Sequence, residues 1–184
     1  ADGLFVAVAG QNQIWRFDLV LATVSVFAGN GELGLVDGAG ADASFAQPSG
    51  LAASKRHLIV ADAAASAVRL ISAEGRVETI VGKGLYDFGD VNGARSDVRM
   101  QNPLAVATDG RGVIHVADSY NHSIKRIDRE SGNTQPIPMT YRLREPQGMS
   151  LLGDRLWIAN TNQHEIVCVD VSTGDTQRIP VAEW

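Results

Sequence analysis

Residues 114–127 read IHVADSYNHSIKRI, in which two β-rich runs flank a short polar turn. The chain contains this pattern four times. Each copy opens with a mostly apolar box that ends in alanine, and the four boxes occupy residues 4–7, 58–61, 114–117 and 156–159. Because the boxes recur every 42 to 56 residues, the chain is built from one repeated unit, and its fold follows from the fold of that unit.

Each unit contains several short β-rich runs. A second run begins seven residues after the alanine, and a third run follows after a turn such as those at residues 73–75 and 172–174. In the last three units a further run starts at Pro48, Pro103 or Pro146 and precedes the box. Four short strands per unit at this period are typical of β-propeller blades, so the sequence predicts an all-β propeller of antiparallel meanders.

We expect about four blades, over residues 1–47, 48–102, 103–145 and 146–184, in one propeller domain. From the ring centre outward, strand a is the proline-led run, strand b the alanine box, strand c the next run and strand d its hairpin partner. The first unit starts at strand b, so fifteen strands are expected where four complete blades have sixteen. An incomplete arc has apolar end faces, through which we expect it to meet missing sequence or a second copy of itself.

Composition restricts the possible functions. The 184 residues are 45% hydrophobic and 20% charged, as in a globular domain, and no apolar run is long enough to cross a membrane. The net charge of −5 disfavours nucleic acid as a partner, since phosphate binding depends on Lys and Arg. The single cysteine, Cys168, excludes an internal disulfide and a thiolate-rich zinc site, and it leaves the compartment open, with the cytoplasm favoured.

The third copy also carries a family resemblance. Its string VADSYNHSIK, residues 116–125, resembles the core of the NHL repeat, and residues 158–166 of the fourth copy are similar. The glycine-rich segments 28–48 and 81–103 resemble those of proteins that join a thioredoxin-like domain to a six-bladed NHL propeller. The resemblance implies that these blades are part of a six-bladed ring in a larger multidomain protein, with about two further blades and the thioredoxin-like part upstream.

Alternating strand directions place the b–c turns and the d–a connectors on one side of the ring, which we call the connector face. The connectors span residues 29–48, 82–103 and 140–146. Because long loops on a rigid scaffold often carry function, we expect this face to bind a protein or peptide. The residues expected in the interaction surface are Asn121, His122, His164, Asp87, Asp90, Arg142 and Arg144.

Asp62, Asp118 and Asn160 follow the alanine box at one equivalent position, where the first unit has Val8. In an enzyme, these side chains and His122 would converge on the ring axis and hold a divalent metal such as calcium or zinc, as in a propeller lactonase or lyase. We favour a structural role, in which each accepts backbone N–H bonds within its own b–c turn, because a group repeated in successive blades serves the architecture. On that view the chain has no catalytic residue and no cofactor.

RNA binding, which some NHL propellers perform, is a third alternative. Lys125, Arg126 and Arg129 lie along one predicted strand and form a local basic patch with Arg142 and Arg144. The acidic net charge and the acidic residues of the adjoining connector oppose RNA binding. The sequence therefore favours a non-catalytic scaffold for protein or peptide binding over a metal-dependent enzyme or an RNA-binding domain.

Overall fold

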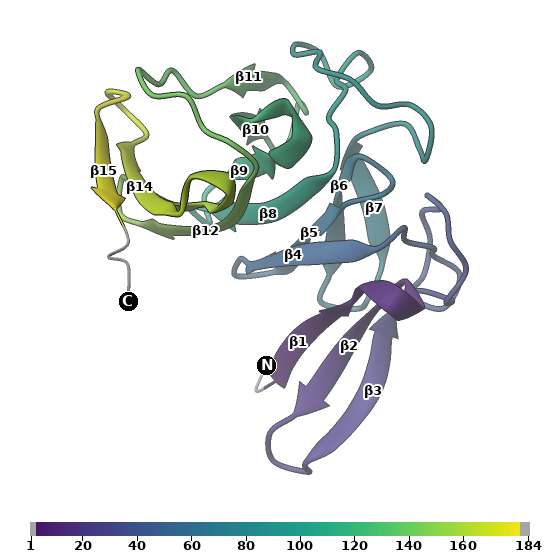
Figure 1. The fold of residues 1–184 in the computed structure, drawn as a ribbon. Coiled ribbons are helices and arrows are strands. Elements are labelled where there is room, and N and C mark those ends of the chain that lie inside the picture. The colour runs from purple at the N-terminus through teal and green to yellow at the C-terminus, as the bar shows by residue number, and fades with distance from the viewer. Residues whose placement is uncertain (1–2, 181–184) are drawn as a thin grey trace.

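The computed structural model describes residues 3–180, which form four antiparallel β-sheets that follow one another along an arc (Figure 1). Each sheet is a meander, in which strands consecutive in the chain are paired. The inner strands β4 (Pro48–Ala53), β8 (Pro103–Thr108) and β12 (Pro146–Leu152) lie side by side and connect the sheets. The architecture is a β-propeller of about four blades, which confirms the all-β prediction.

The strands of each blade follow the predicted order from the inside outward. The first blade consists of β1 (Gly3–Val8), β2 (Gln13–Asp18) and β3 (Thr23–Ala28). The second adds to β4 the strands β5 (His57–Asp62), β6 (Ala67–Ser72) and β7 (Val77–Val81). The third adds to β8 the strands β9 (Val113–Asp118), β10 (Ser123–Asp128) and β11 (Thr134–Pro136). The fourth adds to β12 the strands β13 (Arg155–Asn160), β14 (Glu165–Asp170) and β15 (Thr176–Pro180).

Fifteen strands are present in residues 3–180, with three in the first sheet and four in each of the others, as predicted. β11 has only three residues, because Pro136 and Pro138 have no N–H to donate to a ladder. The β-rich run that follows the turn at residues 172–174 forms β15 up to Pro180, and residues 181–184 lie outside the described residues. The helices that the structure describes are three 3₁₀ turns of three residues, none long and apolar enough to span a membrane.

One large side chain from each connector fills the space between neighbouring blades. Phe45 and Met100 are fully buried, Phe45 in the core cluster that includes Ile14 and Val60. Leu143, which is 2% exposed, occupies the same place between the third and fourth blades. Each of the three residues lies three positions before the proline that opens the next blade. The connectors therefore contribute to the core as well as to the surface.

Two glycines turn the long connectors sharply as they leave strand d. Gly29 and Gly82 have φ angles of 102° and 111°, which residues other than glycine rarely adopt. A Cβ on Gly29 would lie 2.6 Å from the carbonyl oxygen of Asn12, and one on Gly82 would lie 2.5 Å from the Cβ of Ala67. Both positions therefore need glycine for turn geometry and close packing.

The first sheet has one apolar face that is largely exposed. Leu4, Val6, Val24 and Val26 lie on this face and are between 43% and 56% exposed. By contrast, β5 in the second blade is buried along almost its whole length on both faces. The first sheet thus presents to solvent the kind of surface that packs against a neighbouring blade elsewhere in the arc.

Candidate functional site

The b–c turns share one backbone conformation. In three blades a 3₁₀ turn follows strand b: η1 (Ala9–Gln11), η2 (Ser119–Asn121) and η3 (Thr161–Gln163). The next residue is left-handed, with φ of 52° at Asn12, 55° at His122 and 51° at His164. Ser66 has the same conformation in the second blade, with φ of 51°. His122 and His164, the histidines of the NHL-like motif, thus occupy the left-handed position that ends the b–c turn.

Two of these turn residues also tie one blade to the next. Asn12 Oδ1 accepts the N–H of Gln47 at 3.0 Å, and His122 Nδ1 accepts the N–H of Glu145 at 3.1 Å. Gln47 and Glu145 both stand immediately before the proline that opens the following blade. Because Nδ1 of His122 accepts this bond, Nε2 carries the ring proton and remains a donor.

The residues that end strand b accept hydrogen bonds from the connectors. Asp62, Asp118 and Asn160 are fully buried. Their Oδ1 atoms each accept a backbone N–H at 2.7 Å, from Ala46, Gln101 and Arg144 respectively. These donors lie 16 or 17 residues earlier in the chain, in the connector that enters the same blade. The prediction that the donors lie within the b–c turn was wrong, because the side chains face the incoming connector.

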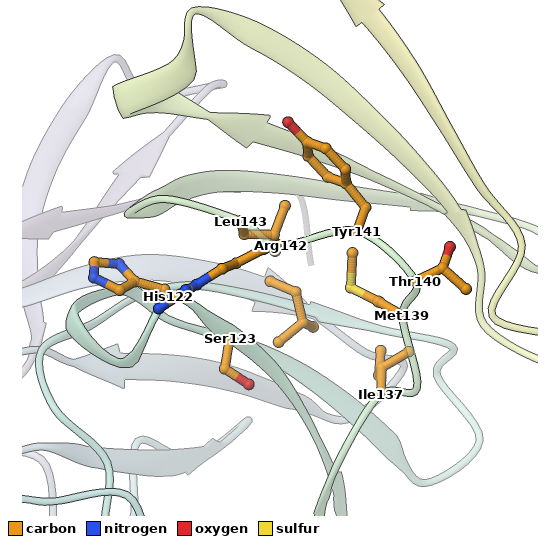
Figure 2. Close-up of a pocket in the computed structure, with 9 residues that line it drawn as sticks. His122, Ser123, Ile137, Met139, Thr140, Tyr141, Arg142 and Leu143 are labelled. Atoms are coloured by element: carbon orange, nitrogen blue, oxygen red, sulfur yellow. The ribbon is translucent and has the colours of Figure 1, made fainter.

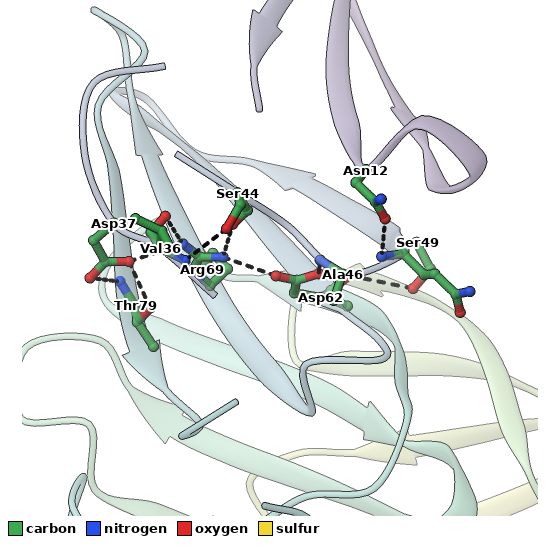
Figure 3. A network of polar contacts seen from close by, with 11 residues as sticks. Asn12, Val36, Asp37, Ser44, Ala46, Ser49, Asp62, Arg69 and Thr79 are labelled. Atoms are coloured by element: carbon green, nitrogen blue, oxygen red, sulfur yellow. Dashed lines mark hydrogen bonds and ion pairs between the residues drawn. The ribbon is translucent and has the colours of Figure 1, made fainter. Parts of the chain in front are cut away.

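In the second blade a buried arginine extends this contact into a network (Figure 3). Arg69 on β6 is fully buried, and its Nη1 lies 2.9 Å from Asp62 Oδ2. Its Nη2 lies 2.9 Å from Asp37 Oδ1 in the first connector. The same guanidinium donates to the carbonyl oxygens of Ser44 and Val36, each at 2.9 Å. One side chain therefore joins strand b, strand c and the connector.

In the third blade Lys125 on β10 takes the place of that arginine. Its Nζ lies 2.9 Å from Asp118 Oδ2 and 2.8 Å from Asp90 Oδ1. The Lys125 side chain is fully buried, so it does not belong to the surface basic patch that the sequence predicted. Arg126, the next residue on the strand, is exposed.

The fourth blade keeps the connector contact without a charge at strand b. Val167 occupies the position of the basic residue on strand c. Asn160 Nδ2 donates to Oε1 of Gln163 and to Oε1 of Glu165, each at 2.7 Å. Glu165 also accepts from Tyr141 Oη at 2.6 Å and from Arg178 Nε at 3.0 Å. In this blade the carboxylate of Glu165, on the neighbouring strand β14, therefore takes the place of the buried ion pair as the partner of the strand-b side chain.

Burial has the largest effect on the strand-b carboxyls. It raises the pKa of both Asp62 and Asp118 above the usual aspartate value, against the lowering effect of the cation beside each. At Glu165 burial acts in the same direction, but hydrogen bonds outweigh it and lower the pKa, the first of them from Tyr141. Each carboxyl is thus bonded to groups of its own blade and of the connector that enters it.

The metal candidates are not brought together. Asp62, Asp118 and Asn160 lie in separate blades, each within its own hydrogen-bond network, and His122 lies on the connector face. Within residues 3–180, no three His, Cys, Asp or Glu side chains are close enough together to hold a metal ion.

Besides His122, whose ring bonds to Glu145, three of the seven residues expected in the interaction surface have internal side-chain partners. Asn121 Nδ2 donates to the backbone of the second connector at 2.7 Å. Asp87 forms an ion pair with Arg99, and Asp90 forms one with Lys125. The contacts of Asn121 and Asp90 hold the second connector against the third blade, whereas the Asp87–Arg99 pair lies within the connector.

The other four expected residues line one groove between the third and fourth blades. The groove has a volume of about 470 Å³ and is lined by His122, Arg142, Arg144, Glu145, Asn162 and His164. A second hollow of about 330 Å³ shares His122 and Arg142 with it (Figure 2). The other residues that line this hollow are Ser123, Ile124, Ile137, Met139, Thr140, Tyr141 and Leu143. We call the two hollows together the basic groove.

The backbone beneath the basic groove is fixed by several contacts. The N–H of Arg144 donates to Asn160, and its carbonyl oxygen accepts the N–H of Asn162 at 3.3 Å. Leu143 points into the core, whereas Arg142 and Arg144 on either side of it are exposed. The connector therefore presents two arginine side chains from a fixed backbone.

Sequence reasoning did not identify Arg69, Leu143 or Glu165. Arg69 follows the strand-b carboxylate by seven residues, as Lys125 does in the next blade, and that repeated spacing indicates the ion pairs. Leu143 is found by counting back from the proline of its blade. No repeated pattern marks Glu165, because its position is taken by Gln13, Ala67 and Ser123 in the other three blades.

No protein-family model matches the chain, but individual proteins do. Human NHL repeat-containing protein 2 is 34% identical over 203 residues, a match that covers 90% of this chain and 28% of that protein. The chloroplastic Protein SUPPRESSOR OF QUENCHING 1 of Arabidopsis thaliana is 30% identical over 184 residues, covering 88% of this chain and 17% of that protein. The chain thus spans less than a third of the length of these curated relatives.

Solved structures support the same architecture. The selenomethionine-substituted virginiamycin B lyase from Staphylococcus aureus superimposes with a TM-score of 0.66 over 98% of this chain and 53% of the lyase. At 13% sequence identity, this similarity shows the fold alone. Together with the four meander sheets and the NHL-repeat relatives, it supports the assignment of this chain as an NHL-type β-propeller of about four blades.

Proposed function

We propose that these blades form a non-catalytic scaffold that binds a protein or peptide in the basic groove of the connector face. The observation that carries this proposal is the convergence of His122, Arg142, Arg144 and His164, from two turns and a connector, on one groove. A groove on a rigid framework, with polar side chains at its rim, suits the recognition of a ligand.

The repeated polar residues support a non-catalytic role. Both carboxylate oxygens of Asp62 and of Asp118 are bonded to groups inside the fold. Asn160, at the equivalent position, has no acid to offer. A catalytic base must reach the proton that it removes, whereas these groups face the chain's own connectors.

We also propose that the scaffold works as one part of a multidomain protein. The resemblance to NHL propellers joined to a thioredoxin-like domain supports this proposal, as does the greater length of the relatives.

Selection from a random displayed peptide library on the immobilised full chain tests the proposed function. Asn162→Trp places an indole in the groove, and Asp154→Trp places one in the exposed β12–β13 turn on the opposite face. We expect the selected peptides to lose affinity by about tenfold or more with Asn162→Trp and to keep it with Asp154→Trp. Peptides that bind Asn162→Trp as well as the unmodified chain would contradict the proposal.

A further inference from the structure

Resting on the proposed function, we infer that the ligand of the basic groove is an acidic peptide segment whose carboxylates pair with Arg142 and Arg144. The inference comes from a comparison of the second and third connectors. Each connector places an arginine four residues before the proline of the next blade, Arg99 before Pro103 and Arg142 before Pro146. The two arginines therefore occupy the same position in the repeat.

The second connector supplies a carboxylate to its own arginine. Asp87 lies twelve residues before Arg99, in the long glycine-rich loop, and forms an ion pair with it. The same loop supplies Asp90 to Lys125. The second connector thus supplies acids both to its own Arg99 and to Lys125 on the neighbouring strand β10.

The third connector is too short to do the same. Residues 137–141, between the end of β11 and Arg142, read IPMTY and contain no acid. In the part of the chain that the structure describes, neither Arg142 nor Arg144 forms an ion pair. Glu145 is the only acid among the residues that line the groove. Arg142 and Arg144 are thus available to carboxylates of a partner.

The surroundings of the arginines favour a peptide over a phosphate polymer. An arginine fork binds a carboxylate through two parallel N–H bonds, and Nε2 of His122 adds a donor at the same rim. Figure 2 shows the Arg142 side chain extending toward His122, with Met139 and Tyr141 on the segment that precedes Arg142. Ile137, Met139 and Tyr141 line the adjoining hollow, so we expect it to take an apolar side chain next to an acidic one. The net charge of −5 opposes RNA, which carries a charge at every nucleotide, more than it opposes a short segment with a few carboxylates.

Fluorescence anisotropy with defined probes tests the inference on the full chain. The probe is a fluorescein-labelled hexapeptide of alternating Glu and Leu, compared with its Gln–Leu and phosphoserine–Leu counterparts and with a single-stranded RNA hexamer. We expect the Glu peptide to bind about tenfold or more tightly than the Gln peptide, with an affinity that falls as salt rises.

Charge variants locate the binding. Arg142→Gln with Arg144→Gln is expected to weaken the Glu peptide by about tenfold or more. Arg76→Gln with Arg111→Gln removes the same charge from exposed turns on the opposite face and is expected to leave its affinity unchanged. Because all four side chains are exposed, circular dichroism should show an unchanged fold.

The outcomes separate the inference from the proposed function. Equal binding of the Glu and Gln peptides, blocked by Asn162→Trp, would overturn the acidic preference and leave the peptide scaffold in place. Tighter binding of RNA or of the phosphoserine peptide, lost with the two arginines, would also overturn it, because the ligand would then be a phosphate. If no peptide binds in the groove, both ideas fail.

Discussion

In both the second and the fourth blade, the residue that ends strand b bonds to the incoming connector, but the side chains around that bond differ. In the second blade Asp62 is bonded to the buried Arg69, whereas in the fourth blade Asn160 and Val167 occupy these two positions. In both blades the Oδ1 atom accepts a connector N–H at 2.7 Å. Both blades therefore keep the acceptor oxygen, and the charge on strand b is present only together with its counter-charge.

The largest expected effect comes from breaking the buried pair on one side. Asp62→Asn keeps the acceptor oxygen but leaves Arg69 without its buried counter-charge. We expect the free energy of unfolding to fall by about 3 kcal/mol, measured by urea unfolding with tryptophan fluorescence. Asp62→Asn combined with Arg69→Met removes both charges, as in the fourth blade, and should recover most of that loss. A double variant whose loss equals the sum of the two single losses would contradict the comparison.

A charge introduced into the fourth blade should have a smaller effect. Asn160→Asp places a carboxylate where Asn160 now lies 2.7 Å from Glu165, and Val167 offers no cation. We expect a loss of about 2 kcal/mol at pH 7. Burial and the like charge raise the pKa of the new carboxyl in the fold, so the loss should shrink as the pH falls toward 4. Asn162→Asp, on the exposed turn nearby, is the control, and an equal loss there would contradict the explanation.

The smallest expected effect lies at the c–d hairpins, where the two blades also differ. Asp170 begins the hairpin of the fourth blade, and Ser72 takes its place in the second. Hydrogen bonds lower the pKa of Asp170, first from the Ser172 hydroxyl and then from its N–H. The stabilisation is therefore present above the unfolded pKa of about 3.9 and is lost as the pH falls through the folded pKa.

Urea unfolding between pH 7 and pH 3 checks this pH dependence. Asp170→Asn should make the unfolding midpoint less sensitive to acid, and Ser72→Asp should make it more sensitive. A carboxyl of Asp170 that titrates at or above pH 3.9 by NMR would remove the basis of the prediction.

The strands could be predicted because the apolar boxes repeat at positions that a simple comparison of the chain with itself detects. The seven-residue step from Ala61 to Val68, found in every unit, predicts the start of strand c to within one residue, since β6 begins at Ala67. The packing of Leu143 was missed because the third connector lacks the glycine pairs by which Phe45 and Met100 can be matched. Counting from the proline, which ends every connector, corrects this.

The partners of the connector-face residues could not be predicted from the sequence. The sequence shows Asp87, Asp90, Arg142 and Arg144 alike as connector charges, yet only the two aspartates form ion pairs within the described residues, and both remain partly exposed. Which charge is paired depends on the path of a loop that folds back over the neighbouring blade, and local sequence does not encode that path. The sequence does show that the second connector is longer than the third. Only the longer connector contains an aspartate that pairs with its arginine, so the length difference indicates that Arg142 and Arg144 have no ion-pair partner within their own connector.

The bond from strand b to the incoming connector has a consequence for how such chains grow. Asp62 and Ala46, or Asp118 and Gln101, lie on one short continuous stretch that also contains the opening strand of the blade. A gene duplication that copies this stretch copies both partners of the hydrogen bond, the connector N–H and the side-chain oxygen at the end of strand b. Successive copies can then change from aspartate to asparagine together with loss of the basic residue on strand c of the same blade, because an amide oxygen accepts the same connector N–H. Blades can therefore multiply first and diverge afterwards, each without waiting for a compensating change in its neighbour.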